Sequence, residues 1–348
     1  MVTSVSLAQQ RKAVVEFFMQ LLDPRNRLID YLRVSVTDRC NLSCSYCKPR
    51  NTIRMQSHDD ILRFEEILRV VQVAALLGIS HVRITGGEPL VRRGVLPFIA
   101  QVCVVPGITD VSVTTNGLLL EEMAGGLRQA GISRLNISMD TLRPERFAAI
   151  TGSDAWERVW RGVAAAEEQG FHPIKLNMVP VKGVNDDEAV DFAALTRDRA
   201  IHVRFIELMP IGAQGCNSST ASRVTAEEIR AKIEDAFGPL APAEQGAGAG
   251  PSRNFRISGG RGVIGFISPI TRHFCDACRR LRLTADGKIR PCLLSDTEID
   301  IKSPLRGGCD DKELERLLMA AIKIKPDRHY LSDAEQGCFS RTMSRIGG

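Results

Sequence analysis

Six short apolar runs alternate with amphipathic segments between residues 32 and 237, and this alternation constrains the fold more than any other feature of the chain. The apolar runs predict strands at 32–37, 81–85, 110–114, 134–138, 174–179 and 202–207. The intervening segments predict helices at 64–77, 95–104, 118–130, 156–169, 188–199 and 225–237. Strands that alternate with helices of this length form parallel sheets. The pattern is compatible both with an open, partial barrel and with a doubly wound sheet.

The chain has 348 residues, enough for two domains or for one barrel with an appendage. A Gly/Ala/Pro-rich stretch at 241–253 indicates a flexible connection. Beyond it we expect short strands at 254–257, 262–267, 281–284 and 288–290, and a helix at 311–323. The predicted organisation is a leader helix at 1–27, a barrel at 28–240 and a smaller C-terminal α+β domain at 241–348.

Polar or sulfur-bearing residues follow or flank each of the six expected strands. In chain order they are Cys40, Cys44 and Cys47, then 86–89, 114–117, 138–140, Lys175 with Asn177, and 207–210. Catalytic groups of parallel α/β folds lie at the C-terminal ends of the strands. We therefore expect these residues to meet at one rim of the fold.

The chain contains ten cysteines, and six of them form two tight groups. The groups are Cys40, Cys44 and Cys47 at spacing C-x3-C-x2-C, and Cys275, Cys278 and Cys292. Thiolates are soft ligands that suit zinc, copper(I) or iron–sulfur clusters, and three of them leave one iron of a four-iron cube open to a small molecule. Clustered cysteines favour metal binding over disulfides and indicate a reducing compartment. Two alternatives remain: the first group as buried thiols on one helical face, and the second as a zinc site completed by His273.

The composition of the chain excludes few functions, but it favours some classes of function over others. The net charge of +5 suits an anionic small substrate and is too weak to indicate nucleic acid. The 5% aromatic content is unfavourable to a zinc-stabilised RNA-binding module, which needs rings for base stacking. No apolar run is long enough to span a membrane, and the N-terminal segment lacks the apolar core of a signal peptide, so we expect a cytoplasmic location.

The first cysteine group carries a specific resemblance. The spacing of Cys40, Cys44 and Cys47, the aromatic residue Tyr46 and the Gly-Gly-Glu-Pro sequence at 86–89 resemble the radical S-adenosylmethionine (SAM) superfamily. The resemblance implies a [4Fe–4S] cluster whose open iron binds SAM and cleaves it to a 5′-deoxyadenosyl radical. Three cysteines at the second group imply a second [4Fe–4S] cluster with its own open iron.

Further motifs resemble one family within that superfamily, the GTP 3′,8-cyclases, or molybdenum cofactor biosynthesis protein A. They are the sequences at 32–41, 114–120 and 204–209, the string from 274 to 293 around the second cysteine group, and the C-terminal Ile-Gly-Gly. The resemblance covers residues 28–348 and implies a partial (β/α)6 barrel of the TIM type with a C-terminal domain that carries the second cluster. Lys48 departs from the family pattern, in which many members have Met.

The resemblance also implies roles for individual residues. The implied cluster ligands are Cys40, Cys44 and Cys47 for the SAM cluster, and Cys275, Cys278 and Cys292 for the substrate cluster. The implied SAM contacts are Tyr46, Gly87, Ser138, Met209 and Arg204. The implied GTP contacts are Arg33, Arg83, Thr114, Lys175, Arg280, Leu281 and Arg282. The implied catalytic residues are Arg33, Arg280, Arg282 and the tail glycines Gly347 and Gly348.

The expected activity is that of a lyase that rearranges GTP to (8S)-3′,8-cyclo-7,8-dihydroguanosine 5′-triphosphate, the first step of molybdenum cofactor biosynthesis. In this reaction the radical removes the ribose 3′ hydrogen and the sugar then attacks guanine C8. Family resemblance further implies a homodimer, a reductant such as flavodoxin or ferredoxin, and a downstream cyclic pyranopterin monophosphate synthase. The alternative enzyme is a peptide-modifying radical SAM protein with an auxiliary cluster, although such proteins usually have a C-terminal extension richer in cysteine.

Overall fold

The computed structural model describes residues 21–47, 56–211, 222–244, 250–329 and 341–347. Most of the predicted leader helix, together with Lys48 and Gly348, lies outside the described residues. Among the described helices, none is long and apolar enough to cross a lipid bilayer.

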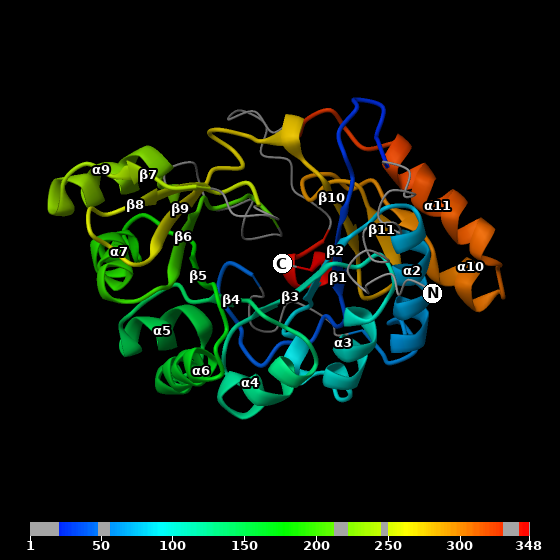
Figure 1. Ribbon diagram of the computed structural model, residues 1–348, viewed down its shortest axis with the longest axis horizontal. Helices are drawn as coiled ribbons and strands as arrows, with labels where there is room; N and C mark the ends of the chain where they lie inside the picture. Colours follow the sequence, from blue (N-terminus) through cyan, green and yellow to red (C-terminus); the bar gives the residue numbers. More distant parts are fainter. Residues whose placement is uncertain (1–20, 48–55, 212–221, 245–249, 330–340, 348) are drawn as a thin grey trace, which may run out of the picture.

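The six predicted strands are present and form the centre of one curved sheet (Figure 1). They are β1 (Tyr31–Ser35), β2 (His81–Thr85), β3 (Asp110–Thr115), β4 (Leu135–Ser138), β5 (Ile174–Met178) and β6 (His202–Ile206). All are parallel, and their order across the sheet is their order in the chain. A doubly wound sheet reverses its order at a switch point. The partial barrel is therefore confirmed and the doubly wound alternative is excluded.

Helices cover the outer face of this sheet, as the amphipathic segments predicted (Figure 1). They are α2 (Phe64–Leu76), α3 (Val95–Cys103), α4 (Leu120–Gln129), α5 (Pro144–Thr151), α6 (Trp156–Glu168), α7 (Ala189–Asp198) and α9 (Ala226–Phe237). Helix α5 was not predicted, although it has a proline in its first turn and ends at Gly152 in the left-handed conformation, which are ordinary start and stop signals.

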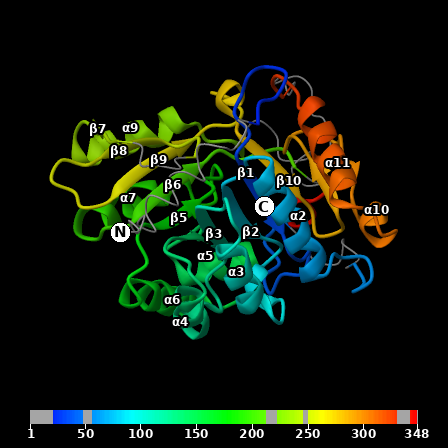
Figure 2. The same ribbon diagram turned by 45° about the vertical axis from the view of Figure 1, so that its right-hand side comes forward.

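The C-terminal residues extend the same sheet at both edges. Strand β9 (Val263–Ile267) pairs in parallel with β6, and β8 (Arg253–Arg256) and β7 (Ala241–Pro242) follow at that edge. Strand β10 (Arg280–Leu283) pairs in parallel with β1, followed by β11 (Lys288–Arg290) and β12 (Ile299–Asp300). Of the helices α10 (Lys302–Arg306), α11 (Asp311–Lys323) and α12 (Met343–Ile346), α11 packs beside α2 (Figure 2).

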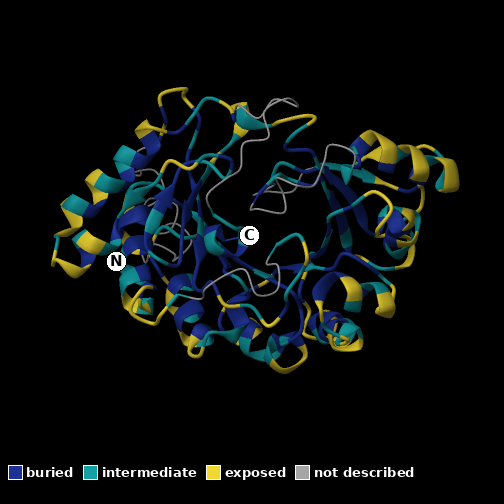
Figure 3. Ribbon diagram, turned by 180° about the vertical axis from the view of Figure 1, so that it is seen from behind, coloured by how far each residue is buried: buried dark blue, intermediate teal, exposed yellow. Residues whose placement is uncertain are grey.

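Side chains alternate across the sheet, and this divides the core from the lumen of the barrel. On β1, Leu32 and Val34 are fully buried in the hydrophobic core, whereas Arg33 and Ser35 point to the opposite face. Figure 3 shows that the central strands are largely buried and that exposed residues lie mainly on the outer helices and loops. The inner face of the central sheet carries polar side chains such as Arg33, Arg83 and Lys175.

Candidate active site

The first cysteine triad lies in the segment that follows β1. Cys40, Cys44 and Cys47 are partly buried, and no disulfide involves them. Burial raises the pKa of the Cys44 thiol well above its ordinary value, and the neighbouring Cys47, Asp140 and Cys40 raise it further. Three thiols that interact electrostatically and bear no disulfide fit the ligand set of an iron–sulfur cluster.

Amide groups point at the Cys40 sulfur, as they do around cluster thiolates. The backbone N–H of Leu42 lies 3.4 Å from this sulfur and the side-chain amide of Asn116 lies 3.7 Å from it. Hydrogen bonds to sulfur are one of the means by which proteins tune cluster potentials. Among the residues described, no three His, Cys, Asp or Glu side chains converge on a single metal-ion position, whereas a four-iron cube binds each thiolate through a different iron.

The Gly-Gly-Glu-Pro sequence holds the cysteine segment by close backbone packing. A Cβ atom on Gly87 would clash with the carbonyl oxygen of Arg39, and the Gly87 N–H donates to the Thr37 carbonyl at 2.6 Å. The buried carboxylate of Glu88 accepts hydrogen bonds from Thr115 Oγ1 at 2.9 Å and from the Asn116 N–H at 2.6 Å. Only glycine permits this approach at residue 87, so the motif joins the ends of β1, β2 and β3.

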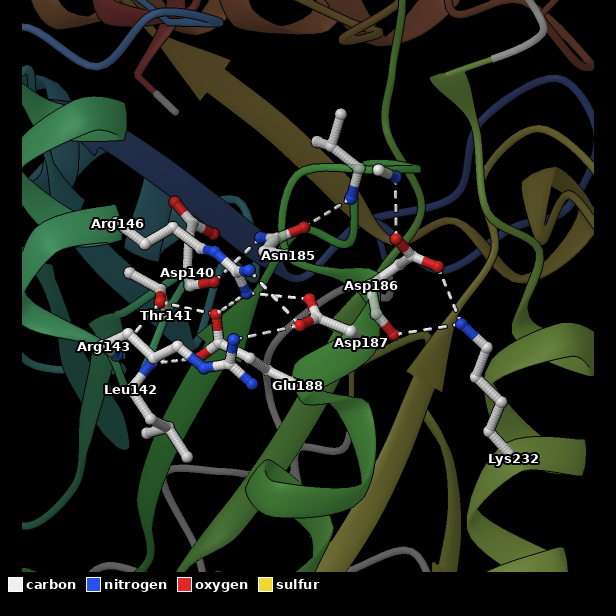
Figure 4. A network of polar contacts seen from close by, with 12 residues as sticks. Asp140, Thr141, Leu142, Arg143, Arg146, Asn185, Asp186, Asp187, Glu188 and Lys232 are labelled. Carbon is white, nitrogen blue, oxygen red and sulfur yellow. Dashed lines mark hydrogen bonds and ion pairs between the residues drawn. The ribbon is translucent and has the colours of Figure 1, made fainter.

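Tyr46 is bound to a buried polar network at the ends of β4 and β5. Figure 4 shows Asp140 and Asn185 of this network. The Tyr46 hydroxyl donates to Asp140. The other carboxylate oxygen of Asp140 accepts the Val179 N–H at 2.9 Å, and Asn185 donates to the Asp140 carbonyl at 2.8 Å. The triad segment is thereby tied to the far side of the rim.

Glu188 completes this network from the end of the short 3₁₀ helix η2 (Asp186–Glu188). Its fully buried carboxylate accepts Thr141 Oγ1 and the Leu142 N–H, both at 2.6 Å, and pairs with Arg146. Because a buried carboxylate needs such partners, the loops after β4 and β5 are held in one arrangement.

A cavity of about 150 Å³ opens beside Tyr46. Its lining residues are Ser45, Tyr46, Asp140, Ile150, Val179, Val181, Val184, Asn185, Leu208, Met209 and Ser222. The lining is mainly apolar, with a few polar groups at the strand ends, and this combination is typical of small-molecule sites. The cavity contains Tyr46 and Met209, two of the predicted SAM contacts.

Basic side chains from several strands share the lumen face. They are Arg33, Arg83, Arg134, Lys175, Arg204, Arg280 and Arg282. In the strand register Arg33 lies between Arg282 and Arg83, and Lys175 and Arg204 lie on neighbouring strands further along the sheet. Asp110 pairs with Arg134, which leaves an excess of positive charge on this face. Such a surface is suited to a polyanion.

Burial and the proximity of like charges shift the pKa values of these basic residues. Burial lowers the pKa of Arg33 far below its ordinary value, and the adjacent Arg282 and Arg83 lower it further. Burial and neighbouring cations lower the pKa of Lys175 to about 6 and those of Arg204 and Arg282 to about 9. Like charges that crowd together in a buried site are stabilised by an anionic ligand.

The second triad lies at the β10 edge of the same sheet. Cys275 belongs to the 3₁₀ helix η4 (Cys275–Ala277), Cys278 follows it and Cys292 comes after β11; no disulfide involves any of them. Electrostatic interaction couples Cys275 to both Cys278 and Cys292. Burial alone would raise the pKa of the Cys278 thiol, but Arg280 and Lys325 lower it to about 6. Burial raises the pKa of the Cys275 thiol, so the thiolate form is favoured at Cys278 in particular. Three grouped sulfurs without a disulfide again fit a cluster.

The C-terminal tail enters the lumen, where Figure 1 shows it at the centre of the barrel. Arg282 donates from Nη1 to the Gly347 carbonyl at 2.9 Å. Ile346 is buried in a small apolar cluster that also contains Met209 and Cys292. The tail therefore lies between the cavity beside the first triad and the second triad.

The structure brings most of the sequence-predicted site residues to one face. Arg282, Arg33 and Arg83 lie side by side in register, and Arg280, which is in register with Tyr31, lies two residues before Arg282 on β10. Thr114, Ser138 and Lys175 lie on β3, β4 and β5. Leu281 is different: it is 1% exposed and belongs to the hydrophobic core, so only its backbone is available to a ligand. Glu207, which follows β6, accepts the N–H groups of Ile270 and Thr271, both at 3.0 Å.

Other residues of the site were not predicted as functional. They are Arg134, Lys325 and Arg27; Asp140 was expected at the rim (138–140) but was assigned no role of its own. Arg134 was detectable, because it alternates with Asn136 on the inward face of an expected strand. Lys325 and Arg27 act through contacts with residues distant in the chain, and no local pattern marks them.

Family models match most of this chain. The radical SAM superfamily model matches residues 34–196, and the Molybdenum Cofactor Synthesis C model matches residues 201–331. The GTP 3′,8-cyclase of Heliobacterium modesticaldum is 51% identical over 328 residues, covering 94% of this chain and 100% of that protein. That of Pelotomaculum thermopropionicum is 49% identical, covering 94% and 99%.

Solved structures share the fold at low sequence identity. SuiB of Streptococcus suis, bound to its precursor peptide SuiA, has a TM-score of 0.53 and 16% identity, covering 87% of this chain and 69% of that one. Native anSMEcpe with bound AdoMet has a TM-score of 0.51 and 16% identity, covering 78% and 77%. At this identity the likeness shows the fold alone.

Proposed function

We propose that this chain, which belongs to the GTP 3′,8-cyclase family of the radical SAM superfamily, converts GTP to (8S)-3′,8-cyclo-7,8-dihydroguanosine 5′-triphosphate in the first step of molybdenum cofactor biosynthesis. One observation carries the proposal: two cysteine triads flank a lumen lined by Arg33, Arg83 and Arg282. The first triad would hold the cluster that generates the radical, and the second would hold the cluster that binds the substrate. The basic surface between them suits a triphosphate.

The first triad fits a [4Fe–4S] cluster through Cys40, Cys44 and Cys47, and the cluster with bound SAM would supply the 5′-deoxyadenosyl radical. Met209 and the Tyr46 backbone, as part of the cavity lining, would hold the adenosine, while Gly87 and Ser138 would contact the rest of the SAM molecule. The apolar lining of this cavity excludes water from the reactive carbon.

Arginines of the lumen would bind the triphosphate. Arg33, Arg83 and Arg282 offer planar forks that match phosphate oxygens in two-point contacts, and Thr114 Oγ1 is buried without a hydrogen-bond partner among the described residues. Arg204 would contact SAM, as the sequence predicted. It is buried, and burial together with Arg83 and Arg134 lowers its pKa to about 9, so an anionic group of a ligand would stabilise its charge.

The second triad would hold a cluster whose open iron orients the guanine base. Arg280, two residues after Cys278, would neutralise charge near that cluster and guide the nucleotide. We further propose that a flavodoxin or ferredoxin supplies the electron, that the protein acts as a cytoplasmic homodimer, and that a cyclic pyranopterin monophosphate synthase takes the product.

GTP binding is expected to take up about one proton per nucleotide at pH 8. In the ligand-free protein the pKa of Lys175 is about 6, so the amine is neutral at pH 8; beside a triphosphate its pKa would return towards the ordinary value of roughly 10.4. Calorimetry of GTP binding in two buffers of different ionisation enthalpy measures this uptake. Lys175→Met should remove this proton uptake, while the arginines of the lumen still bind the nucleotide. Equal proton uptake in both proteins would contradict the assignment of Lys175 to the triphosphate.

Anaerobic incubation with SAM, dithionite and GTP tests the activity itself. Mass analysis should detect 5′-deoxyadenosine and the cyclised nucleotide, which has the mass of GTP but a different retention time. Formation of 5′-deoxyadenosine without change in GTP would indicate another substrate. Zinc in place of iron would exclude radical chemistry altogether.

A further inference from the structure

The second triad is divided over separate segments, and a single lysine joins two of them. Lys325, just after α11, is 6% exposed. Its ammonium donates to the Arg280 carbonyl at 2.7 Å and to the Pro291 carbonyl at 2.6 Å. The first carbonyl follows Cys278 by two residues and the second directly precedes Cys292. Lys325 therefore fixes the spacing between these two ligands.

Arg27 joins the third ligand to the same region. Its Nη1 donates to the Cys275 carbonyl and to the Asp327 carbonyl, each at 2.9 Å, and its Nη2 donates to the Pro326 carbonyl at 2.7 Å. Its Nε is held by Asp23 at 2.6 Å in a buried ion pair. One guanidinium thus connects the η4 segment to the chain that follows Lys325.

The two cations differ in how their charge is balanced. The charge of Arg27 is neutralised by Asp23. Among the residues the structure describes, no carboxylate forms an ion pair with Lys325; its hydrogen-bond partners are carbonyls, and its favourable charge interactions are with the sulfurs of Cys278 and Cys292. The lysine charge is therefore directed at the sulfur ligands.

We propose that Lys325 and Arg27 are positioning residues for the second cluster, that both hold its three ligand-bearing segments together, and that Lys325 also raises the reduction potential of this cluster. The inference rests on the proposed function, which assigns a cluster to this triad. A buried positive charge stabilises the reduced, more negative form of a cluster, and net charge and burial are recognised determinants of cluster potentials. Arg27, neutralised by Asp23, should affect cluster retention more than potential.

Three full-length variants, reconstituted anaerobically with iron and sulfide, test this assignment. Lys325→Met and Arg27→Met remove the two cations. Arg69→Met is the matched control, because Arg69 also binds an aspartate through Nε, Asp311 at 2.8 Å, and a cysteine carbonyl, that of Cys309 at 2.7 Å. The measurements are iron per chain, the rate of iron loss to a chelator, and the midpoint potential of the second cluster by EPR-monitored titration. The signal of that cluster is identified by its absence in Cys278→Ser.

The expected result is a lower midpoint potential in Lys325→Met, equivalent to at least a threefold change in the ratio of oxidised to reduced cluster at fixed potential. Arg27→Met should lose iron from the second cluster several-fold faster than the unsubstituted protein. Arg69→Met should match the unsubstituted protein in both measurements, and Lys325→Arg should restore the potential because it keeps the charge. SAM cleavage without GTP should persist in all of these variants.

Unchanged potential and unchanged iron loss in both Met variants would overturn the proposal. If Lys325→Met assembles no second cluster, the holding role is supported. Lys325→Gln, whose amide keeps N–H donors but carries no charge, then tests the potential, and an unchanged potential there overturns the charge role. Failure of the proposed function looks different: the unsubstituted protein would then hold about four irons per chain instead of about eight.

Discussion

Cys44→Ala is expected to abolish SAM cleavage, whereas Cys292→Ala is expected to leave SAM cleavage measurable and to abolish the conversion of GTP. The two cysteines belong to separate triads: Cys44 lies in the segment after β1, and Cys292 follows β11. Loss of one thiolate of three removes the cluster that the triad holds, because a cluster iron without its ligand is readily lost. Ser45 and Tyr46, which lie between Cys44 and Cys47, line the cavity that also contains Met209.

The measurement is anaerobic turnover with separate quantification of 5′-deoxyadenosine and of the nucleotide. Cys309→Ala is the control, because Cys309 is similarly half-buried but belongs to neither triad. We expect its turnover to be normal. If Cys44→Ala and Cys292→Ala both cyclise GTP normally, the arrangement of two clusters across the lumen is wrong.

Regular features of the fold were predictable from local pattern. The six parallel strands have close to their predicted bounds, because buried parallel strands are short apolar runs separated by amphipathic helices. The attachment of β9 to β6 and of β10 to β1 was not predictable. Strand pairing depends on side-chain fit between distant segments, which no local periodicity records.

The residues of the candidate site likewise divide into those that a local pattern identifies and those that it does not. Cys40 and Arg33 were identified because each lies in a recognisable motif at a strand. Arg27 was assigned no role, because its significance depends on the Cys275 carbonyl, which is 248 residues away in the chain. Asp140 was part of the expected rim, but its bond to Tyr46 spans 94 residues. Contacts of this kind depend on the tertiary structure, so the sequence alone does not reveal them.

Gly347→Val is expected to lower the rate of GTP cyclisation by roughly 100-fold, while SAM cleavage and the iron content persist, since a 1 Å displacement at a reaction site can cost this much. Gly347 has φ of +76°, and a Cβ atom there would lie 2.9 Å from Thr85 Oγ1 and 3.0 Å from Ser35 Cβ. A β-branched side chain would push the tail away from β1 and β2. Arg282 would then lose its hydrogen bond to the Gly347 carbonyl.

Gly308→Val is the control that separates displacement of the tail from backbone strain. Gly308 has φ of +81°, and a Cβ atom there would meet nothing within 4 Å. Both substitutions cost about 1–2 kcal/mol of left-handed strain, but only the one at residue 347 displaces atoms of the lumen. Deletion of Gly347 and Gly348 should reproduce the loss of cyclisation with both clusters retained. Equal turnover in Gly347→Val and Gly308→Val would show that the tail has no part in the reaction and that Arg282 acts on the nucleotide without it.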